Sequence, residues 1–404
     1  MRSLLLVAQI APPSELVAAR RVAGFAKYLA RLGYRVTVLT SQVSGSGPIE
    51  GAERVVRTSD LLVSRLNWRR GHFDAFSGEG QGGYAEPSVL ERVVVPDLSA
   101  VTWLPFALPA ALRLVRDERF DCVLTSSPPP SAHLVGLALK RRGLCWIADF
   151  RDGWTFEPGH APWFVGPQGW ADASLERRVA RQADAAVAVS QPIADDLRER
   201  FGLRTELITN GFDPDDSLGP DADGLLDPNR HSLVHTGRMA AAGRSPKALL
   251  EALRAAPALA EKLEVVFAGP LSEDERGLLD ASDLSGVVRP VGSLDRARTL
   301  ALQRAADSLL VVTGGARRSE ATGKLYEYLA ARRPVLVLGE DTEAARIVAE
   351  TESGFATSVD DPEAIAAALR RLVESPPQVG TSADEYAYPE LARRLADLIE
   401  DVCA

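Results

Sequence analysis

Short apolar runs alternate with longer amphipathic segments along almost the whole chain, and this alternation restricts the fold more than any other feature. The apolar run at residues 3–10 is followed by residues 15–32, where apolar positions recur at helical spacing, and then by a second run at 34–40. A strand, a helix and a strand in this order form a βαβ unit with parallel strands. The alternation therefore predicts an α/β chain built on parallel sheets.

The chain is long enough for two such domains. It has 404 residues, whereas a single core rarely serves more than about 300 residues. Five further strand-like runs, each preceding an amphipathic segment, lie at residues 232–235, 264–267, 287–291, 308–312 and 335–338. We predict two Rossmann-like domains facing each other across a cleft, at residues 1–204 and 205–385, followed by a helix within 386–404. A strand at 205–209 is expected to open the second domain.

Residues 43–90 interrupt this rhythm. They are rich in Gly and Ser and carry Phe73, Phe76 and Tyr84 among polar neighbours. A long irregular stretch in an α/β domain is usually either a functional loop or a disordered one.

Composition and sequence pattern argue against several classes of protein. The net charge of −9 argues weakly against a nucleic-acid partner. No apolar run reaches the length of a membrane span, and the N-terminal run lacks a cleavage site, so it is expected to be a buried strand. Of the three scattered cysteines, Cys122 and Cys145 lie in apolar runs and are expected to be buried thiols, which is typical of a cytoplasmic protein. The five histidines lack a ligand spacing, so no metal site is expected.

Residues 322–331 combine a cation and a carboxylate at the start of a predicted helix. Lys324 and Glu327 are three positions apart, so both side chains leave the first turn on the same side. The N–H groups of such a helix and the lysine can face a phosphate, while the carboxylate can face ribose hydroxyls. The alternative is a solvated surface pair.

A second candidate loop follows the predicted strand at 232–235. Gly237 would let the backbone approach a ligand closely, and Arg238 and Arg244 can bind a diphosphate through paired N–H donors. The alternative is a solvated loop with ordinary surface arginines. Gly269 and Gly292 follow two other strands of this half, and we expect them at the same edge of the sheet.

Charged residues also follow the predicted strand at 144–148. Asp149, Arg151 and Asp152 place two carboxylates and a guanidinium within four residues. Such a cluster can orient an acceptor hydroxyl or serve as a base. The alternative is a helix cap beside a surface ion pair.

Together these motifs resemble the retaining GT-B glycosyltransferases of family four, especially the bacterial branch that builds cell-surface polysaccharides and glycoconjugates. The resemblance spans almost the whole chain. Its motifs are Pro12-Pro13 with Arg20-Arg21, Ser126-Ser127-Pro128-Pro129, residues 149–154, residues 183–190, residues 208–213, residues 235–238 with 244–246, and residues 324–330 with 333–336.

The resemblance implies that the domain at 205–385 binds a UDP- or GDP-linked sugar. Glu327 would bind the ribose, Arg238 and Arg244 the diphosphate, and Lys324 would lie near the phosphates. Gly237, Leu294 and Leu325 complete the implied donor site, with Leu294 near the base.

The domain at 1–204 would bind the acceptor, which the resemblance leaves open as a glycan, a glycolipid or a small-molecule scaffold. Asp149, Arg151, Trp154 and His133 are the implied acceptor residues. The sugar would be transferred with retention of configuration and without a metal or other cofactor, and the last helix would cross back onto this domain. The implied location is cytoplasmic, with peripheral membrane contact as a further option.

The implied catalytic residues are Asp152, Arg238 and Glu320, and they include one departure from the family pattern. The family has a Glu eight residues before the ribose-binding Glu, where this chain has Ser319, with Glu320 one residue later. The N-terminal histidine of some members has no clear match, because Thr125 or Ser126 stands there and His133 is several residues downstream. Two alternatives remain: a catalytically altered binding protein, which the departure at Ser319 permits, and a nucleotide-sugar epimerase, a different enzyme class on the same fold.

Overall fold

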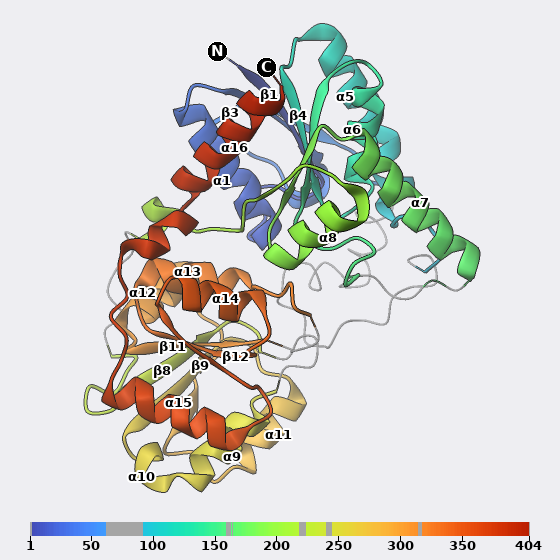
Figure 1. The fold of residues 1–404 in the computed structure, drawn as a ribbon. Coiled ribbons are helices and arrows are strands. Elements are labelled where there is room, and N and C mark those ends of the chain that lie inside the picture. The colour runs from blue at the N-terminus through green and yellow to red at the C-terminus, as the bar shows by residue number, and fades with distance from the viewer. Residues whose placement is uncertain are drawn as a thin grey trace. The chain divides into compact units, whose positions relative to one another are not determined.

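The computed structural model describes residues 2–61, 92–158, 163, 165–217, 224–239, 245–313 and 317–403. The chain forms two compact units. Of the described residues, those up to Asn210 and those from Tyr388 onward form the first unit, and those from Gly211 to Ala387 form the second. Each unit has its own parallel sheet and its own core (Figure 1).

The first unit contains a seven-stranded sheet in the order β3-β2-β1-β4-β5-β6-β7, with every pair parallel. The strands are β1 (Ser3–Ala8), β2 (Arg35–Ser41), β3 (Ala52–Thr58), β4 (Cys122–Ser127), β5 (Cys145–Phe150), β6 (Ala185–Ala188) and β7 (Thr205–Leu207). The helices are α1 (Val17–Arg31), α4 (Ser99–Thr102), α5 (Leu104–Asp117), α6 (Ala132–Lys140), α7 (Gly166–Gln182), α8 (Gln191–Phe201) and α16 (Tyr388–Val402).

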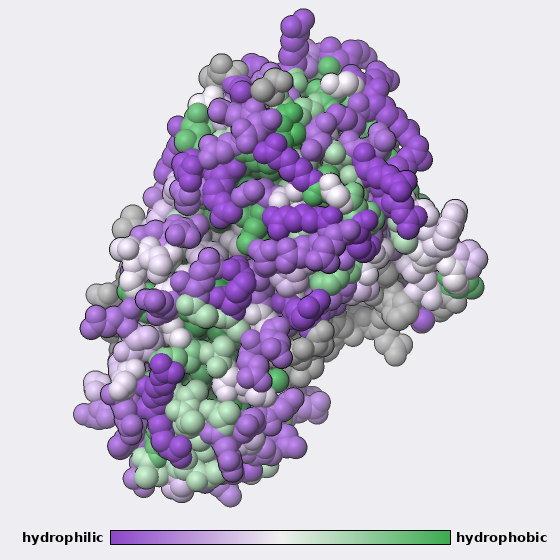
Figure 2. Space-filling model, viewed as in Figure 1, coloured by the Kyte–Doolittle hydropathy of each residue, from purple (hydrophilic) through white to green (hydrophobic). Residues whose placement is uncertain are grey.

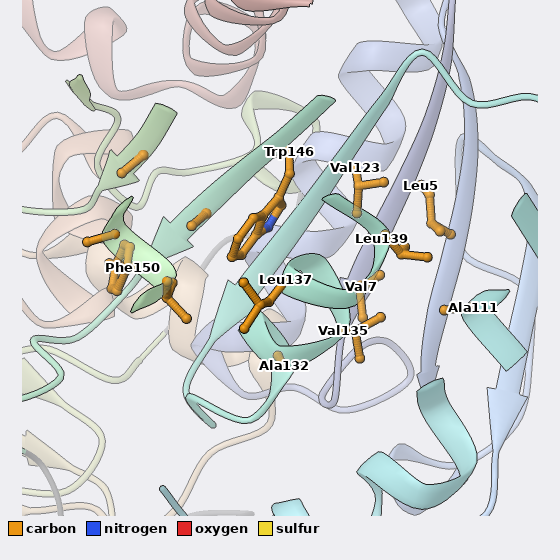
Figure 3. Close-up of a cluster of buried hydrophobic side chains, with 14 of the residues drawn as sticks. Leu5, Val7, Ala111, Val123, Ala132, Val135, Leu137, Leu139, Trp146 and Phe150 are labelled. Atoms are coloured by element: carbon orange, nitrogen blue, oxygen red, sulfur yellow. The ribbon is translucent and has the colours of Figure 1, made fainter. Parts of the chain in front are cut away.

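Side chains of successive strand residues enter two different cores. Leu5 and Val7 of β1 pack with Trp146 and the α6 residues Val135 and Leu139 on one face (Figure 3). The intervening residues of β1 pack with α1 and α16 on the other face. Both faces of a parallel sheet are covered by helices, which explains why its strands read as continuous apolar runs.

Strand β7 corrects the predicted domain boundary. We expected residues 205–209 to open the second domain, but Thr205 pairs with Ala186 of β6, so β7 is the edge strand of the first sheet. A five-residue strand-like segment does not specify which sheet it joins. The units divide after Asn210.

The C-terminal helix α16 belongs to the first unit, as predicted. Its residues Leu391, Leu395 and Ile399 are buried in the same core as Phe25 of α1. The two helices approach closely at Gly24, where a Cβ atom would lie 2.4 Å from the ring of Tyr388. Only glycine fits at this crossing.

One of the two cysteine predictions is wrong. Cys145 was predicted to be a buried thiol, but it forms a disulfide with Cys403, which follows α16. Cys122 is a buried free thiol, as expected. Because the two bonded residues are 258 positions apart, their spacing offered no indication of the pair. The cysteine pattern therefore no longer favours a reducing compartment.

The second unit contains a six-stranded parallel sheet in the order β10-β9-β8-β11-β12-β13. Helices α9, α10 and α15 contribute to the core on one face, and α12, α13 and α14 to the core on the other. The strands are β8 (His231–Thr236), β9 (Leu263–Ala268), β10 (Val288–Pro290), β11 (Ser308–Val312), β12 (Val335–Leu338) and β13 (Gly354–Thr357). The helices are α9 (Lys247–Ala255), α10 (Pro257–Ala260), α11 (Glu273–Asp280), α12 (Arg296–Ala305), α13 (Gly323–Ala331), α14 (Glu343–Glu350) and α15 (Pro362–Glu374).

The polarity of the surface is consistent with helices that cover both faces of each sheet. Hydrophilic side chains cover much of the first unit's visible face (Figure 2), as expected for amphipathic helices on a buried sheet. Among the described residues, no helix has both the length and the apolar character that crossing a membrane requires.

Candidate functional site

The strand order of the second unit identifies one edge of its sheet as the candidate donor site. The chain passes from β8 outward to β9 and β10, then returns to the other side of β8 as β11. Ligands of open α/β sheets bind at the carboxyl ends of the strands where the order reverses. Gly237 and Arg238 follow β8 at this edge, and α13 follows β11.

Lys324, in the first turn of α13, reaches back to the end of β8. Its ammonium group donates hydrogen bonds to the carbonyl oxygen of Arg238 and to Nε2 of His235, the latter at 3.2 Å. The other ring nitrogen of His235, Nδ1, lies 2.9 Å from the carbonyl oxygen of Leu310. A carbonyl only accepts, so Nδ1 carries the proton and Nε2 accepts from the lysine. The imidazole therefore holds the lysine in place.

Two glycines make this arrangement possible. Gly237 has φ +77°, and a Cβ atom there would lie 3.0 Å from Cε of Lys324. A Cβ atom on Gly269, after β9, would lie 2.4 Å from the carbonyl oxygen of Gly237. Glycine is therefore needed at both strand ends, once for its backbone conformation and once for close approach.

In the described part of the chain, the N-terminus of α13 has no cap from the side chain of its N-cap residue. Thr322 occupies the N-cap position, but its hydroxyl does not cap the helix. Within the described residues, its Oγ1 atom is buried without a hydrogen-bond partner. Uncapped N–H groups and the helix dipole both favour negative charge. With the adjacent Lys324, this end of the helix can bind phosphate.

Glu327 lies one turn further along α13 and is held at both carboxylate oxygens. Arg296 Nη1 donates to Oε1 at 3.1 Å, and Gln303 Nε2 donates to Oε2 at 3.1 Å. Its side chain is 14% exposed. Each oxygen can accept more than one hydrogen bond, so the fixed carboxylate can still receive two adjacent hydroxyl groups.

Three residues of this network were not predicted as site residues: Arg296, Gln303 and His235. Arg296 also pairs with Asp216 at 2.6 Å, which connects the start of α12 to the segment Pro214–Ser217. Gln303 is fully buried and also donates to Thr236 Oγ1. The only sequence signal was the position of Arg296 at the start of a helix, which does not specify its partner.

The remaining predicted donor residues have different placements. Leu325 is fully buried and its side chain belongs to the core, so this side chain does not support the predicted donor contact. Leu294 is half-buried against the same core. Arg244 lies outside the described residues.

Glu320 and Ser319 lie in a segment that leads into α14. The carbonyl oxygen of Glu320 accepts from the N–H of Ala344, and that of Arg318 accepts from Glu343. The backbone of this segment therefore binds the first turn of α14. Both Ser319 and Glu320 are half-buried.

In the first unit, Asp149 has a structural environment that the sequence did not indicate. Its side chain is 1% exposed and forms a two-point ion pair with Arg21 of α1, at 2.7 and 3.0 Å. Ser126 donates to the same carboxylate at 2.7 Å. Arg21 also donates to the carbonyl oxygens of Ile208 and Thr209. The buried pair therefore connects α1 and β5 to the segment that follows β7. A carboxylate enclosed in this way does not support acceptor contact by Asp149.

His133 is likewise enclosed, with no exposed surface. Nδ1 lies 2.8 Å from Thr125 Oγ1 and Nε2 lies 2.8 Å from Ser127 Oγ. Trp146 donates to Thr125 Oγ1, which leaves the threonine hydroxyl able to donate to His133. Burial lowers the pKa of His133 to about 3. This is a neutral core histidine, and its burial does not support the predicted acceptor contact.

The loop after β5 presents the other acceptor candidates. Trp154 is 3% exposed and donates to buried Asp172 at 2.7 Å, so it anchors the loop. Arg151 donates to the carbonyl oxygens of Ser127 and Pro128, which fixes it at the ends of β4 and β5. Asp152 is exposed beside it. Arg151 and Asp152 are therefore the predicted acceptor-side residues that lie at least partly on the surface.

Comparisons with known proteins agree with this fold. Solved structures with similar folds include sucrose-phosphate synthase from Thermosynechococcus elongatus, with a TM-score of 0.68, 18% identity and 99% of each chain covered. HepE from Anabaena in complex with UDP has a TM-score of 0.59 and 14% identity, over 99% of this chain and 100% of that chain. A structure described as "Trehalose-6-phosphate from E. coli bound with UDP-2-fluoro glucose" has a TM-score of 0.59 and 15% identity over 99% of each.

These likenesses define the two-domain GT-B fold. The family comparison adds that residues 18–216 match the model of Glycosyltransferase Family 4, and residues 230–375 match that of Glycosyl transferases group 1. Comparison with curated proteins gave no match. The chain belongs to the family 4 glycosyltransferases of the GT-B type.

Proposed function

We propose that this glycosyltransferase moves a sugar from a nucleoside-diphosphate sugar to an acceptor hydroxyl, with retention of anomeric configuration. The observation that carries the proposal is the fixed pair on α13: Lys324 held by His235 at the helix N-terminus, and Glu327 held by Arg296 and Gln303 one turn later. The pair matches the two polar parts of a nucleotide, a phosphate and a ribose.

The donor would bind along the first turn of α13. Two ribose hydroxyls would donate to the two oxygens of Glu327, which are already oriented by Arg296 and Gln303. The phosphates would lie at the helix N-terminus, where the N–H groups and Lys324 attract negative charge. UDP is the favoured donor nucleotide, because similar folds hold UDP or a UDP-sugar analogue. GDP remains the alternative.

Catalysis would rest on stabilising the departing diphosphate. Lys324, with Arg238 at the end of β8, would stabilise its negative charge, and fixed cations of this kind lower the barrier because they need no reorganisation. A leaving phosphate oxygen would accept the proton of the acceptor hydroxyl on the same face of the sugar, which retains the configuration. These cations would replace a metal ion, so a chelator is expected to leave turnover unchanged.

The acceptor would bind at the first unit, near the carboxyl ends of β4 and β5. Exposed Asp152 and backbone-anchored Arg151 are the residues best placed to contact it. A glycan, a glycolipid and a small-molecule scaffold all remain possible acceptors. A cytoplasmic location, with or without peripheral membrane contact, also remains a prediction.

A panel of sugar nucleotides tests the proposal. Thermal unfolding is measured with each UDP- and GDP-sugar, and the stabilising donors are then incubated with candidate acceptors. A glycosylated product with the donor's anomeric configuration, by NMR, is the expected result. Epimerised sugar nucleotide without acceptor would identify an epimerase instead. Donor binding without turnover across a broad acceptor panel would favour a binding protein altered at Ser319.

A further inference from the structure

The three cysteines of the chain meet at one point. Cys122, Cys145 and Cys403 are the only cysteines among 404 residues. They come from the first residue of β4, the first residue of β5 and the residue after α16. Their sulfur atoms all lie within 4.8 Å of one another. Three distant segments therefore bring every cysteine side chain of the protein to one place.

The fold fixes this meeting point. Cys122 and Cys145 are directly opposite each other in the parallel pairing of β4 and β5. Cys403 continues the helical hydrogen bonding of α16, with its N–H donating to Ile399 at 2.9 Å. The site lies at the amino ends of these strands, whereas the candidate acceptor residues Arg151 and Asp152 follow the carboxyl end of β5. The cysteine cluster is therefore separate from the proposed transfer chemistry.

The cluster has the chemistry of a metal site. In the structure Cys145 and Cys403 are joined and Cys122 is a buried thiol beside them. When the disulfide is reduced, three sulfur ligands face one another. Zinc–sulfur bonds of about 2.3 Å place sulfurs about 3.8 Å apart around a tetrahedral ion, a separation that lies within the observed limit of 4.8 Å.

The cluster is accessible to an ion from solvent. A metal ion deprotonates the thiols that coordinate it. Cys145 and Cys403 are only half-buried, so an ion can reach the cluster from solvent.

We infer that the reduced chain binds one thiophilic cation, of the Zn²⁺ or Cu⁺ class, through the sulfurs of Cys122, Cys145 and Cys403. Soft thiolate ligands select these metals. A dithiol reductant supplies two electrons and two protons, which convert the protein disulfide to two thiols while the dithiol closes to its own cyclic disulfide. The cation then displaces thiol protons to the solvent. A small-molecule disulfide, which takes up the two electrons and two protons and becomes two thiols, re-forms the Cys145–Cys403 bond; this removes two ligands and closes the site.

Cadmium is a suitable probe, because its bonds to thiolates give an ultraviolet charge-transfer band. The full-length protein is reduced, freed of reductant without air, and titrated with Cd²⁺ alone. The expected result is a band that saturates at one equivalent. In the oxidised protein the band is absent, and reduction restores it.

Substitutions complete the test. Cys122→Ser removes one ligand but leaves the disulfide possible, so the oxidised variant reports on folding independently of metal. The reduced variant is expected to bind Cd²⁺ about 100-fold more weakly or worse, since even indirect partners of a metal contribute 10- to 100-fold. The Cys403→Ser variant, which also lacks the disulfide, should bind Cd²⁺ with a similar loss of affinity. The inference is overturned if the reduced wild-type protein gives no band, or if Cys122→Ser binds Cd²⁺ as tightly as wild type.

Discussion

The ammonium group of Lys324 lies 3.2 Å from Nε2 of His235, and the protonated Nδ1 of that ring is bonded to the Leu310 carbonyl. The lysine's direction at the helix N-terminus is therefore set by a buried imidazole in one tautomer. This contact joins α13 to the end of β8, the two elements that form the candidate donor site.

Replacing His235 by Ala is expected to weaken binding of a nucleoside diphosphate about 5- to 10-fold. The charge of Lys324 remains, but one hydrogen bond that orients it, worth about 1 kcal/mol, is lost. Calorimetric titration with UDP measures the change.

His231→Ala is the matched control. His231 lies on the same strand and bonds Ser308 Oγ at 2.9 Å, at the other end of β8. It should alter stability and leave affinity unchanged. Equal losses of affinity in both variants would show that the His235 effect is not specific to the site.

Gly237→Ala is expected to reduce donor affinity by displacing Lys324. The new methyl group would meet Cε of Lys324 at 3.0 Å, in addition to the strain of φ +77°. Gly224→Ala introduces similar strain, at φ +75°, with nothing within 4 Å. Both variants should lose about 1 to 2 kcal/mol of stability. Only Gly237→Ala should raise the KM for the donor, and an unchanged KM would contradict the proposed position of Lys324.

The buried His133 predicts acid sensitivity of the first unit. Its folded pKa of about 3 lies below the unfolded value of 6.5, so below pH 6.5 the unfolded state binds more protons. The contribution of neutral His133 to the free energy of unfolding is fully present above pH 6.5 and decreases as the pH falls toward 3. At pH 5 the loss is about 2 kcal/mol.

Urea unfolding between pH 8 and pH 5 measures this loss. His133→Gln should be less stable at pH 8 but should lack this part of the acid dependence. If both proteins lose stability equally between pH 8 and pH 5, His133 does not titrate as described.

Reduction of the Cys145–Cys403 disulfide is expected to destabilise the first unit by about 2 to 4 kcal/mol, because a cross-link between distant positions restricts the unfolded chain. Thermal unfolding with and without dithiothreitol, in the absence of added metal, measures the effect. Cys403→Ser cannot form the bond, so its melting temperature should match that of reduced wild type with or without dithiothreitol. Cys122→Ser keeps the bond, so its melting temperature should still fall when reductant is added. If the melting temperature of wild type is the same with and without dithiothreitol, the disulfide is not formed in solution.

Local sequence patterns predicted much of the fold and part of the candidate donor site. The alternation of apolar runs identified both sheets, and the spacing of Lys324 and Glu327 placed both residues in the first turns of α13. These features depend on neighbours within a few residues. Gly237 was also found at the end of its strand, because turns follow local rules.

Relationships between distant segments could not be predicted. The partners of Asp149 and Cys145 lie 128 and 258 positions away. Strand β7 was assigned to the wrong unit because a short strand-like segment carries no information about its partner strand. His133 is different: it precedes Leu134 and Val135, and this apolar setting was a usable signal of burial.

The central claim is that Glu327 binds the ribose of the donor. Calorimetric titration of wild type and Glu327→Gln with UDP and GDP tests it most directly, since the amide keeps the size of the side chain but removes the charge and one acceptor. Wild type is expected to bind one of these nucleotides, and Glu327→Gln to bind it at least about tenfold more weakly, with the same melting temperature to within a few degrees. Equal affinity in the two proteins, or no binding of either nucleotide by wild type, would contradict the account.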